Sequence, residues 1–407
     1  MLHIFKEINF PKSLQSFNVG IKRYFTPDAL SSYKRGAGGR SSFNGVVATV
    51  FGPNGFVGET LVNVLGKEGT QMIIAHRCDF NWSDRLKIYG DLGQILYCHY
   101  QPNDVDESNL YKAMKYSNVV VNLIGTLFET NNYSFEETHI EIPRRLARIA
   151  RECGVNKFIH VSHIAARSDP LGPSLLSSPA SHRILKTKAL GEEAVLNEFP
   201  EGAIILKPST LFGFGDRFFS LYANAKRRSG RVLLPLWRRG EATIKSPLYV
   251  FDLARAIARI ASPLTPREIV VGKRFHLTGP QAYTLAELCD WMHQLIHLEP
   301  EVSGYTRTEL DLMIWIKTKL PRIKFFVPPF ITPEALEYEF VSEEPELGDL
   351  NFADLGITNL VEINSVGPYC LFNFRIDGNF DRVYAGDNYE NQLPPLEYPP
   401  PRPLYNI

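Results

Sequence analysis

The chain has 407 residues, of which 44% are hydrophobic and 22% charged, so it can bury a sizeable core and is long enough for two lobes. Lysine plus arginine equals aspartate plus glutamate at 44 each, and this balance gives no reason to expect a nucleic-acid partner. The five cysteines form no Cys-x-x-Cys pair, which argues against a disulfide framework or a zinc site, and no apolar run approaches the roughly 20 residues of a spanning helix.

The first 45 residues are basic and contain serines. Seven lysines and arginines stand there against only Glu7 and Asp28. This composition is typical of a mitochondrial transit peptide, and equally of a disordered basic arm. We interpret residues 1–37 as such a leader or arm.

A glycine-rich turn follows the first apolar run. Residues 46–51 are apolar apart from one threonine, and glycines then stand at 52, 55 and 58, followed by apolar residues at helical spacing. This pattern predicts a buried strand that turns into a helix whose N-terminus holds a pyrophosphate. The spacing differs from the Gly-x-Gly-x-x-Gly of most dehydrogenases and favours relatives of the short-chain dehydrogenases. The expected cofactor contacts in this turn are Gly52, Asn54, Gly55, Phe56, Val57 and Gly58.

Arg77 ends the second apolar run, nineteen positions after Gly58. An acidic residue at this place suits the ribose 2′-hydroxyl of NAD, whereas an arginine suits the 2′-phosphate of NADP. Asp79 is close enough to reach the ribose if the strand ends later. On balance the sequence favours NADP(H) as the cofactor, with Arg77 as a contact.

Strand and helix patterns then alternate along the chain. Further strands are expected at 95–98, 119–125, 158–162 and 203–208, with helices at 109–116, 135–153 and 185–199 between them. Such alternation predicts an α/β fold with a doubly wound parallel sheet of the Rossmann type. Ligands bind such sheets at the carboxyl ends of the strands. There we expect further cofactor contacts from Asp104, Val105, Leu123, Ile124, Gly125, Ser162, Pro208 and Ser209.

The chain after the sixth strand is assigned to a smaller second lobe. The resulting division is a leader or arm at 1–37, an NADP-binding Rossmann domain at 38–215, a C-terminal lobe interleaved with the sheet at 216–390, and a proline-rich tail at 391–407. The tail has six prolines between 392 and 407 and favours an extended conformation suited to lying along a partner.

Five short segments together resemble a known family. Gly52-x-x-Gly55-x-x-Gly58, residues 122–125, residues 160–163, Lys188-Ala189-x-Gly191-Glu192 and residues 207–209 are similar to the atypical short-chain dehydrogenases/reductases. Residues 39–42, 47–52 and 90–94 more narrowly resemble the NADPH-binding accessory subunits of mitochondrial respiratory complex I. This resemblance implies a matrix-side subunit near the joint of the peripheral and membrane arms, which contacts other complex I subunits and holds NADPH without turning it over.

The expected catalytic pair of a short-chain reductase is incomplete. These enzymes use Tyr-x-x-x-Lys, in which tyrosine donates the proton and lysine holds the ribose and lowers the tyrosine pKa. Here Lys188 is present, but Ile184 stands four positions earlier and cannot transfer a proton. Lys188 can still bind the ribose, so the sequence predicts cofactor binding without catalysis and no catalytic residue.

An enzymatic alternative stays open. It is an NADPH-dependent atypical short-chain reductase or epimerase with its own small-molecule substrate, in which Tyr133 or Tyr222 replaces the missing proton donor. His293 and His297 lack the glutamate of zinc proteases and are interpreted as part of an amphipathic surface helix, and no metal site is expected. Residues 310–331 mix aromatic and basic side chains, and they are a candidate for contact with membrane lipid or for a core helix.

Overall fold

The computed structural model describes residues 35–77, 80–102, 106–170, 172–173, 181–223, 233–234, 236–296, 303–304, 332–345 and 349–374. Most of the leader, the proline-rich tail and residues 310–331 lie outside the described residues, as do Asp79, Asp104, Val105 and His297. The predictions made for them stay predictions.

A seven-stranded sheet, parallel throughout, forms the centre of the molecule. Its strand order is β11-β6-β5-β4-β1-β2-β3, so the chain starts in the middle and winds outward in both directions. This arrangement confirms the predicted doubly wound fold. The strands are β1 (Val47–Phe51), β2 (Gln71–His76), β3 (Ile95–His99), β4 (Val119–Asn122), β5 (Lys157–Val161), β6 (Ala203–Pro208) and β11 (Arg274–Leu277).

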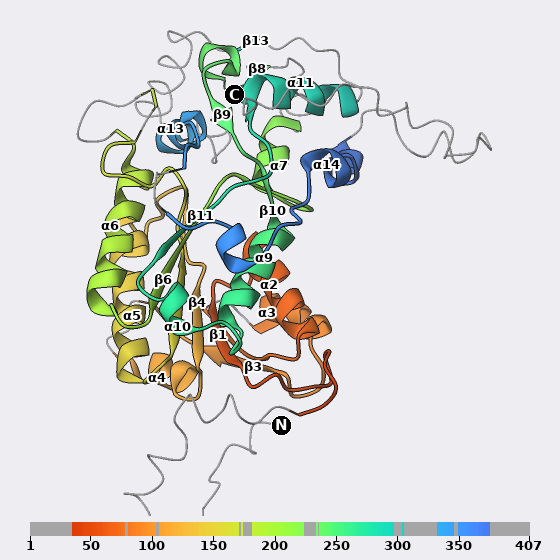
Figure 1. The fold of residues 1–407 in the computed structure, drawn as a ribbon. Coiled ribbons are helices and arrows are strands. Elements are labelled where there is room, and N and C mark those ends of the chain that lie inside the picture. Colours follow the sequence, from red (N-terminus) through yellow and green to blue (C-terminus); the bar gives the residue numbers. More distant parts are fainter. Residues whose placement is uncertain are drawn as a thin grey trace, which may run out of the picture.

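Helices cover both faces of this sheet, with α4, α5 and α6 on one side and α2 and α9 on the other (Figure 1). They are α2 (Phe56–Lys67), α4 (Ser108–Met114), α5 (Ile142–Glu152), α6 (Arg183–Glu198) and α9 (Val250–Ala261), with the short α3 (Phe80–Asp84), η3 (Arg85–Tyr89) and α10 (Arg267–Val270) at the periphery. A π-helical turn, η4 (Glu137–Glu141), leads into α5. Because both faces are covered, β1 is buried along its whole length, as its apolar run requires.

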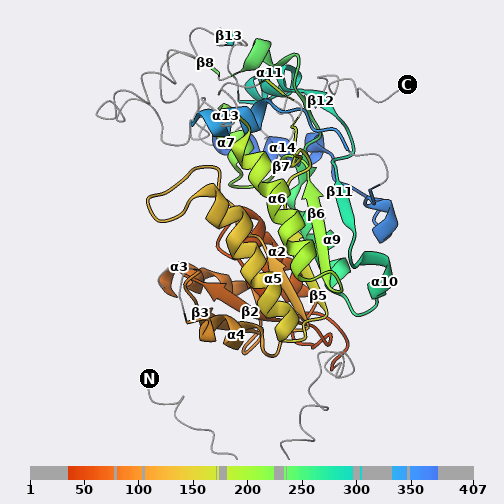
Figure 2. The same cartoon turned by 90° about the vertical axis from the view of Figure 1, so that its left-hand side faces the viewer.

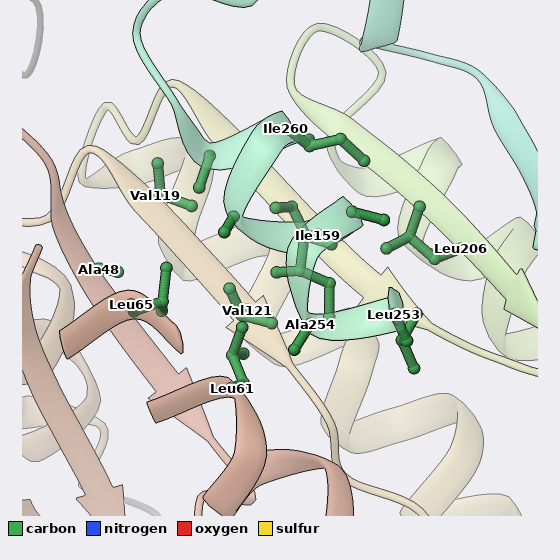
Figure 3. Close-up of a cluster of buried hydrophobic side chains, with 14 of the residues drawn as sticks. Ala48, Leu61, Leu65, Val119, Val121, Ile159, Leu206, Leu253, Ala254 and Ile260 are labelled. Atoms are coloured by element: carbon green, nitrogen blue, oxygen red, sulfur yellow. The ribbon is translucent and has the colours of Figure 1, made fainter. Parts of the chain in front are cut away.

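The larger core lies between the sheet and the helices α2 and α9. Alternate residues of the strands meet the apolar faces of these two helices there, for example Val121 of β4, Leu61 of α2 and Ala254 of α9 (Figure 3). A second cluster fills the opposite face under α4, α5 and α6. The α9 part of the first core comes from far along the chain, so the C-terminal half completes the Rossmann unit.

The second lobe lies beyond the carboxyl ends of the strands (Figures 1 and 2). It has its own aromatic core, which includes Phe219, Tyr222 and Trp291. Its elements are β7 (Leu211–Phe212), α7 (Arg217–Ala223), β8 (Leu233–Leu234), η5 (Trp237–Gly240), β9 (Ile244–Lys245), β10 (Leu248–Tyr249), β12 (Tyr283–Thr284), α11 (Leu285–Leu295), β13 (Ser303–Gly304), α13 (Pro333–Phe340) and α14 (Ile363–Leu371); η7 (Ala353–Leu355) packs near α9 instead.

The C-terminal half returns to the sheet through β10, α9 and β11. β10 pairs with β7, and α9 starts directly after β10. The chain then adds β11 to the sheet edge beside β6, a seventh strand that the sequence analysis missed. β11 is only four residues long and contains an arginine and a histidine, so it lacks the continuous apolar run that marks the other strands.

Candidate functional site

The glycine-rich turn connects β1 to α2 and has the geometry of a phosphate-binding turn. Gly52 has a φ of +79°, and a Cβ there would lie 3.1 Å from the carbonyl carbon and oxygen of Leu123. A Cβ on Gly58 would lie 2.4 Å from the oxygen of Gly52 and 2.6 Å from that of Pro53, so only glycine lets the helix approach its own turn. At Gly55 a Cβ would meet just one atom, the Gly52 oxygen at 3.5 Å, which leaves room on the ligand side.

The N-terminus of α2 starts at this turn. Gly55 is the N-cap, and its carbonyl accepts the first helical hydrogen bond from the Glu59 N–H at 3.0 Å. The positive end of the helix dipole is therefore available to an anion. Asn54 connects the turn to α3, since its side-chain amide donates a hydrogen bond to the Ser83 hydroxyl at 3.0 Å. The residues present thus fit the pyrophosphate of a dinucleotide.

Arg77 follows the last residue of β2 and is exposed. Its guanidinium carbon lies 5.1 Å from the centroid of the Tyr133 ring, which belongs to the loop between β4 and η4. Among the described residues, no carboxylate lies within ion-pair distance of Arg77, while Asp79 is outside them. The cation is thus held by an aromatic ring that does not neutralise it.

A buried amide, Asn122, forms hydrogen bonds at the carboxyl end of β4. The Asn122 side chain accepts the Ile124 N–H at 3.1 Å and lies 3.0 Å from Nδ1 of His160. Burial, with the nearby charge of Lys188, lowers the pKa of His160 to about 3, so this ring is neutral. The predicted contacts Leu123, Ile124 and Gly125 follow directly, and Leu123 donates its N–H to the Phe51 oxygen at 3.0 Å.

Ser162 at the end of β5 is engaged by the protein itself. Its hydroxyl forms a short hydrogen bond with Glu192, a carboxylate of α6 that is 2% exposed and lies 3.7 Å from the Lys207 ammonium. The Ser162 oxygen is therefore part of a buried charged network. The Ser162 hydroxyl is thus bound to a carboxylate of the protein itself, a partner that its position at the end of a strand does not reveal.

Lys188 lies on α6, one turn after Ile184, as the sequence predicts. Ile184 is 1% exposed, and the Lys188 ammonium lies 5.6 Å from the ring centroid of Tyr338 on α13. Burial lowers the pKa of Lys188 to about 8, against the opposing charge of Glu192. The ring of Tyr338 also lies 4.6 Å from that of His163, which closes this side of the lysine.

The segment 332–345 covers the site around Lys188. Besides Tyr338, it contributes Val341, which packs with Ile164, Ala165 and Leu185 in one buried apolar cluster. A Cβ on Gly172 would lie 2.9 Å from the Val341 side chain, so the two segments are in close contact. The Lys188 ammonium therefore faces the ring of Tyr338 on the chain's own α13.

Glu343 fixes the end of this covering segment. Its carboxylate is fully buried, lies 3.3 Å from the Lys245 ammonium, and accepts the N–H groups of Ser246 and Thr210 at 3.1 Å each. Removing a carboxylate from such a buried pair typically costs about 3–5 kcal/mol, because it leaves the other charge unpaired. The predicted contact Ser209 is bound to the same region, as its hydroxyl donates to the Ser246 carbonyl.

The two tyrosines considered as substitute proton donors lie elsewhere. Tyr222 is fully buried in the core of the second lobe, and burial followed by Glu339 raises its pKa well above 10. Tyr133 contacts Arg77 at the end of β2. The aromatic ring that faces Lys188 is Tyr338 instead. The sequence analysis did not identify this tyrosine, because it lies 150 residues further along the chain.

Of the two histidines considered as metal ligands, His293 lies on α11, and His297 is outside the described residues. The side chain of His293 is fully buried on the core side of this amphipathic helix. Within the described residues, no cluster of three or more His, Cys, Asp or Glu side chains has a metal-binding arrangement. The same residues contain no helix that is long and apolar enough to cross a membrane.

Comparisons with known proteins agree with this geometry. Residues 48–272 match the model of the NAD dependent epimerase/dehydratase family. The enzyme WbmH of Bordetella bronchiseptica, solved with NAD+, has the same fold, with a TM-score of 0.57 and 13% sequence identity over 82% of this chain and 99% of that chain.

Relatives of greater sequence similarity are respiratory subunits by name. NADH dehydrogenase (ubiquinone) 1 alpha subcomplex subunit 9 of Rattus norvegicus is 42% identical over 262 residues, which is 64% of each chain, so the match spans somewhat less than two thirds of that relative. The 40 kDa subunit of NADH-ubiquinone oxidoreductase of Neurospora crassa is 30% identical over 347 residues, 85% of this chain and 84% of that one. The chain therefore belongs to the NAD dependent epimerase/dehydratase family and, within it, to the group of relatives named as subunits of mitochondrial NADH-ubiquinone oxidoreductase.

Proposed function

We propose that this chain is an accessory subunit of mitochondrial respiratory complex I that binds NADP(H) and supports assembly or stability of the complex without catalysing a reaction. The relatives from rat and Neurospora crassa support this assignment by their names and by the extent of their similarity. The other subunits of the complex are then its partners. Its place is on the matrix side of the inner membrane, near the joint of the peripheral and membrane arms.

The cofactor is NADP(H), bound across the carboxyl ends of the strands. The turn at residues 52–58 and the N-terminus of α2 would hold the pyrophosphate, Arg77 the 2′-phosphate, and Lys188 the ribose next to the nicotinamide. When bound, the nicotinamide supplies a hydride in enzymes of this class. Here the nucleotide acts as a ligand that stabilises the folded state by mass action.

One observation carries the non-catalytic part of the proposal, namely the contact of Tyr338 with Lys188. The Tyr338 ring lies beside the lysine, and Ile184 supplies no acidic proton one helical turn earlier. Reduction of a substrate carbonyl would need space beside the lysine and a proton donor. On this proposal a bound NADPH therefore lacks the proton donor of Tyr-x-x-x-Lys, and Tyr338 occupies part of the space next to Lys188.

The test is to extract the endogenous protein in mild detergent, separate it by native electrophoresis, and identify the nucleotide released from it. We expect migration with a megadalton respiratory assembly and about one NADPH per chain. A free protein that exchanges its nucleotide readily and reduces a carbonyl substrate would contradict the proposal and favour the reductase or epimerase alternative, with which the family match is compatible.

A further inference from the structure

The loop at residues 125–136 connects β4 to η4 and is attached at both ends of the candidate cofactor site. We refer to it as the clasp. In Figure 2 it projects, in gold, from the start of the α5 helix on the side of the molecule where α3 lies. The clasp begins at Gly125, the last of the predicted cofactor contacts at 123–125. Its position therefore affects how a nucleotide enters and leaves the site.

The root of the clasp is fixed to α6 by a buried histidine. His139 lies 2.8 Å from the Thr187 hydroxyl through Nδ1, and its Nε2 lies 3.1 Å from the Thr126 carbonyl oxygen. Burial, followed by the charge of Lys188, lowers the pKa of His139 to about 3, so the ring is neutral and can donate one bond and accept the other. The root is thus joined to the residue next to Lys188.

An ion pair holds the middle of the clasp. Glu129 lies 2.9 Å from the Arg183 guanidinium at the start of α6, and it also accepts the Phe135 N–H at 3.3 Å. Arg183 in turn lies 5.3 Å from the ring centroid of Phe135 and pairs with Glu136. These contacts hold the middle of the loop against the end of the site that would receive the nicotinamide.

The tip of the clasp reaches the opposite end of the site. Thr130 and Tyr133 form a turn in which the Thr130 N–H donates to the Tyr133 oxygen at 3.0 Å, and the Tyr133 ring then contacts Arg77. Since β1 lies between β4 and β2 in the sheet, a loop that leaves β4 and contacts the residue after β2 spans the carboxyl end of β1, where the turn of residues 52–58 starts. That turn is the glycine-rich phosphate-binding turn.

We infer that Tyr133 is a cofactor-retention residue: it holds the Arg77 guanidinium in place for the phosphate of NADP(H) and closes the clasp over the phosphate-binding turn. This inference rests on the proposed binding of a dinucleotide. An aromatic ring suits the task better than a carboxylate, because it orients the guanidinium and leaves its charge available to the phosphate. Release of the nucleotide then requires that Tyr133 and Arg77 separate.

The experiment measures how fast the full-length protein releases NADPH, followed by nucleotide fluorescence after an excess of NADP+ is added. Tyr133→Ala should release NADPH about two- to fivefold faster, the factor expected for an exposed cation–π contact, and should accelerate NADH release less. Tyr133→Phe keeps the ring and should behave like the wild type. Tyr116→Ala is the matched control, because Tyr116 forms a contact of the same 5.1 Å with Lys115 outside the site.

Two outcomes would overturn the inference while leaving the proposed function intact. In one, Tyr133→Ala releases NADPH at the wild-type rate; in the other, Tyr133→Phe releases it as fast as Tyr133→Ala, which would assign the effect to the hydroxyl. A wild-type protein that binds no dinucleotide would instead refute the proposed binding and the inference together. Equal thermal unfolding of the nucleotide-free variants and wild type ensures that release rates are compared between folded proteins.

Discussion

Arg77 and Lys188 are the two cations that define the ends of the candidate cofactor site, and their surroundings differ. Arg77 is exposed and faces the Tyr133 ring, whereas Lys188 is half-buried beside Tyr338 and near the neutral His160 and His163. A guanidinium at the surface keeps its charge for a ligand. Lys188, with a pKa lowered to about 8 by burial, would gain a partner for its ammonium when ribose hydroxyls bind.

The first prediction concerns cofactor choice at Arg77. Arg77→Glu should weaken NADPH binding by about 10- to 100-fold, since hydrogen bonds to charged groups contribute roughly 1.5–3 kcal/mol, and it should change NADH binding far less. Titration of both nucleotides by fluorescence measures the two affinities. An equal loss of both would show that Arg77 does not contact the 2′-phosphate.

Asp216 is a second residue whose ionisation depends on the fold. It is 2% exposed at the start of α7 and accepts the Phe219 N–H at 3.3 Å. Burial raises the pKa of its carboxyl from 3.8 to about 8, so the group is neutral in the folded protein at pH 7 and charged in the unfolded chain. The stability that this neutral carboxyl contributes is present in full below pH 4 and is lost as the pH rises toward 8.

Asp216→Asn should therefore gain stability relative to the wild type as the pH rises from about 4 to about 8. The expected slope is up to about 1.4 kcal/mol per pH unit, and the amide keeps an oxygen for the Phe219 N–H. Urea unfolding of both proteins across this range measures the difference. The control is Asp106→Asn, an exposed carboxyl whose pKa is lowered by its bond to the Ser108 N–H, and which should show no such trend. A pH-independent difference at Asp216 would mean that its carboxyl is ionised in the folded state.

At the scale of elements, α6 and α13 together decide what the site can do. α6 carries Lys188 in the register of an active reductase, but α13 presents Tyr338 to that lysine. The buried Glu343 and Lys245 pair anchors the end of the covering segment to the second lobe. The segment 332–345 is therefore attached to the rest of the protein by the buried pair of Glu343 and Lys245 and by the apolar cluster around Val341.

This arrangement predicts the outcome of restoring the missing tyrosine. Ile184→Tyr should not produce carbonyl reduction, because the Tyr338 ring still lies against Lys188. A spectrophotometric assay of NADPH oxidation with a panel of aldehydes and ketones tests this, with Ile184→Phe as the control for the extra bulk at a site that is 1% exposed. Turnover by Ile184→Tyr alone would show that the site is accessible to substrate.

The elements that the sequence predicted are those with strong local patterns. The six apolar strands and the helix with Lys188 were predicted to within a few residues, because each carries a continuous run or stripe of apolar residues in the sequence. The π-helical turn before α5 was predicted as ordinary helix, because its apolar pattern does not distinguish the two. The structure packs this turn closely on α6, where a Cβ on Gly191 would lie 1.9 Å from the His139 oxygen. β11 was missed because an edge strand of four residues has no distinctive pattern.

At the scale of the whole molecule, the C-terminal half of the chain contributes to the central sheet and to the core under it, in addition to the separate aromatic core of the second lobe. β11 and α9 come from the C-terminal half, yet β11 pairs with β6 and α9 packs on α2. The second lobe and the Rossmann unit are thus connected by buried contacts as well as by the chain. We therefore expect them to unfold as one cooperative unit.

NADPH should stabilise this whole unit although its proposed contacts lie mostly on the Rossmann side. At a concentration of one hundred times Kd, the gain is about 2.7 kcal/mol, and a calorimetric scan should show a single transition shifted upward as a whole. NADH at the same concentration should shift it less. Two separate transitions, of which NADPH moves only one, would contradict the expected cooperative unfolding.

The sequence by itself determined the doubly wound sheet, the phosphate-binding turn and the absence of a tyrosine at 184, because each depends on neighbouring residues and on local spacing. Only the tertiary structure decided that Tyr338 covers Lys188, that Glu343 is paired with Lys245, and that Tyr133 holds Arg77. These contacts join residues that are from 56 to 150 positions apart along the chain. Such pairs leave no periodic pattern in the sequence, since what brings them together is the order of the strands and the packing of the second lobe on the sheet edge.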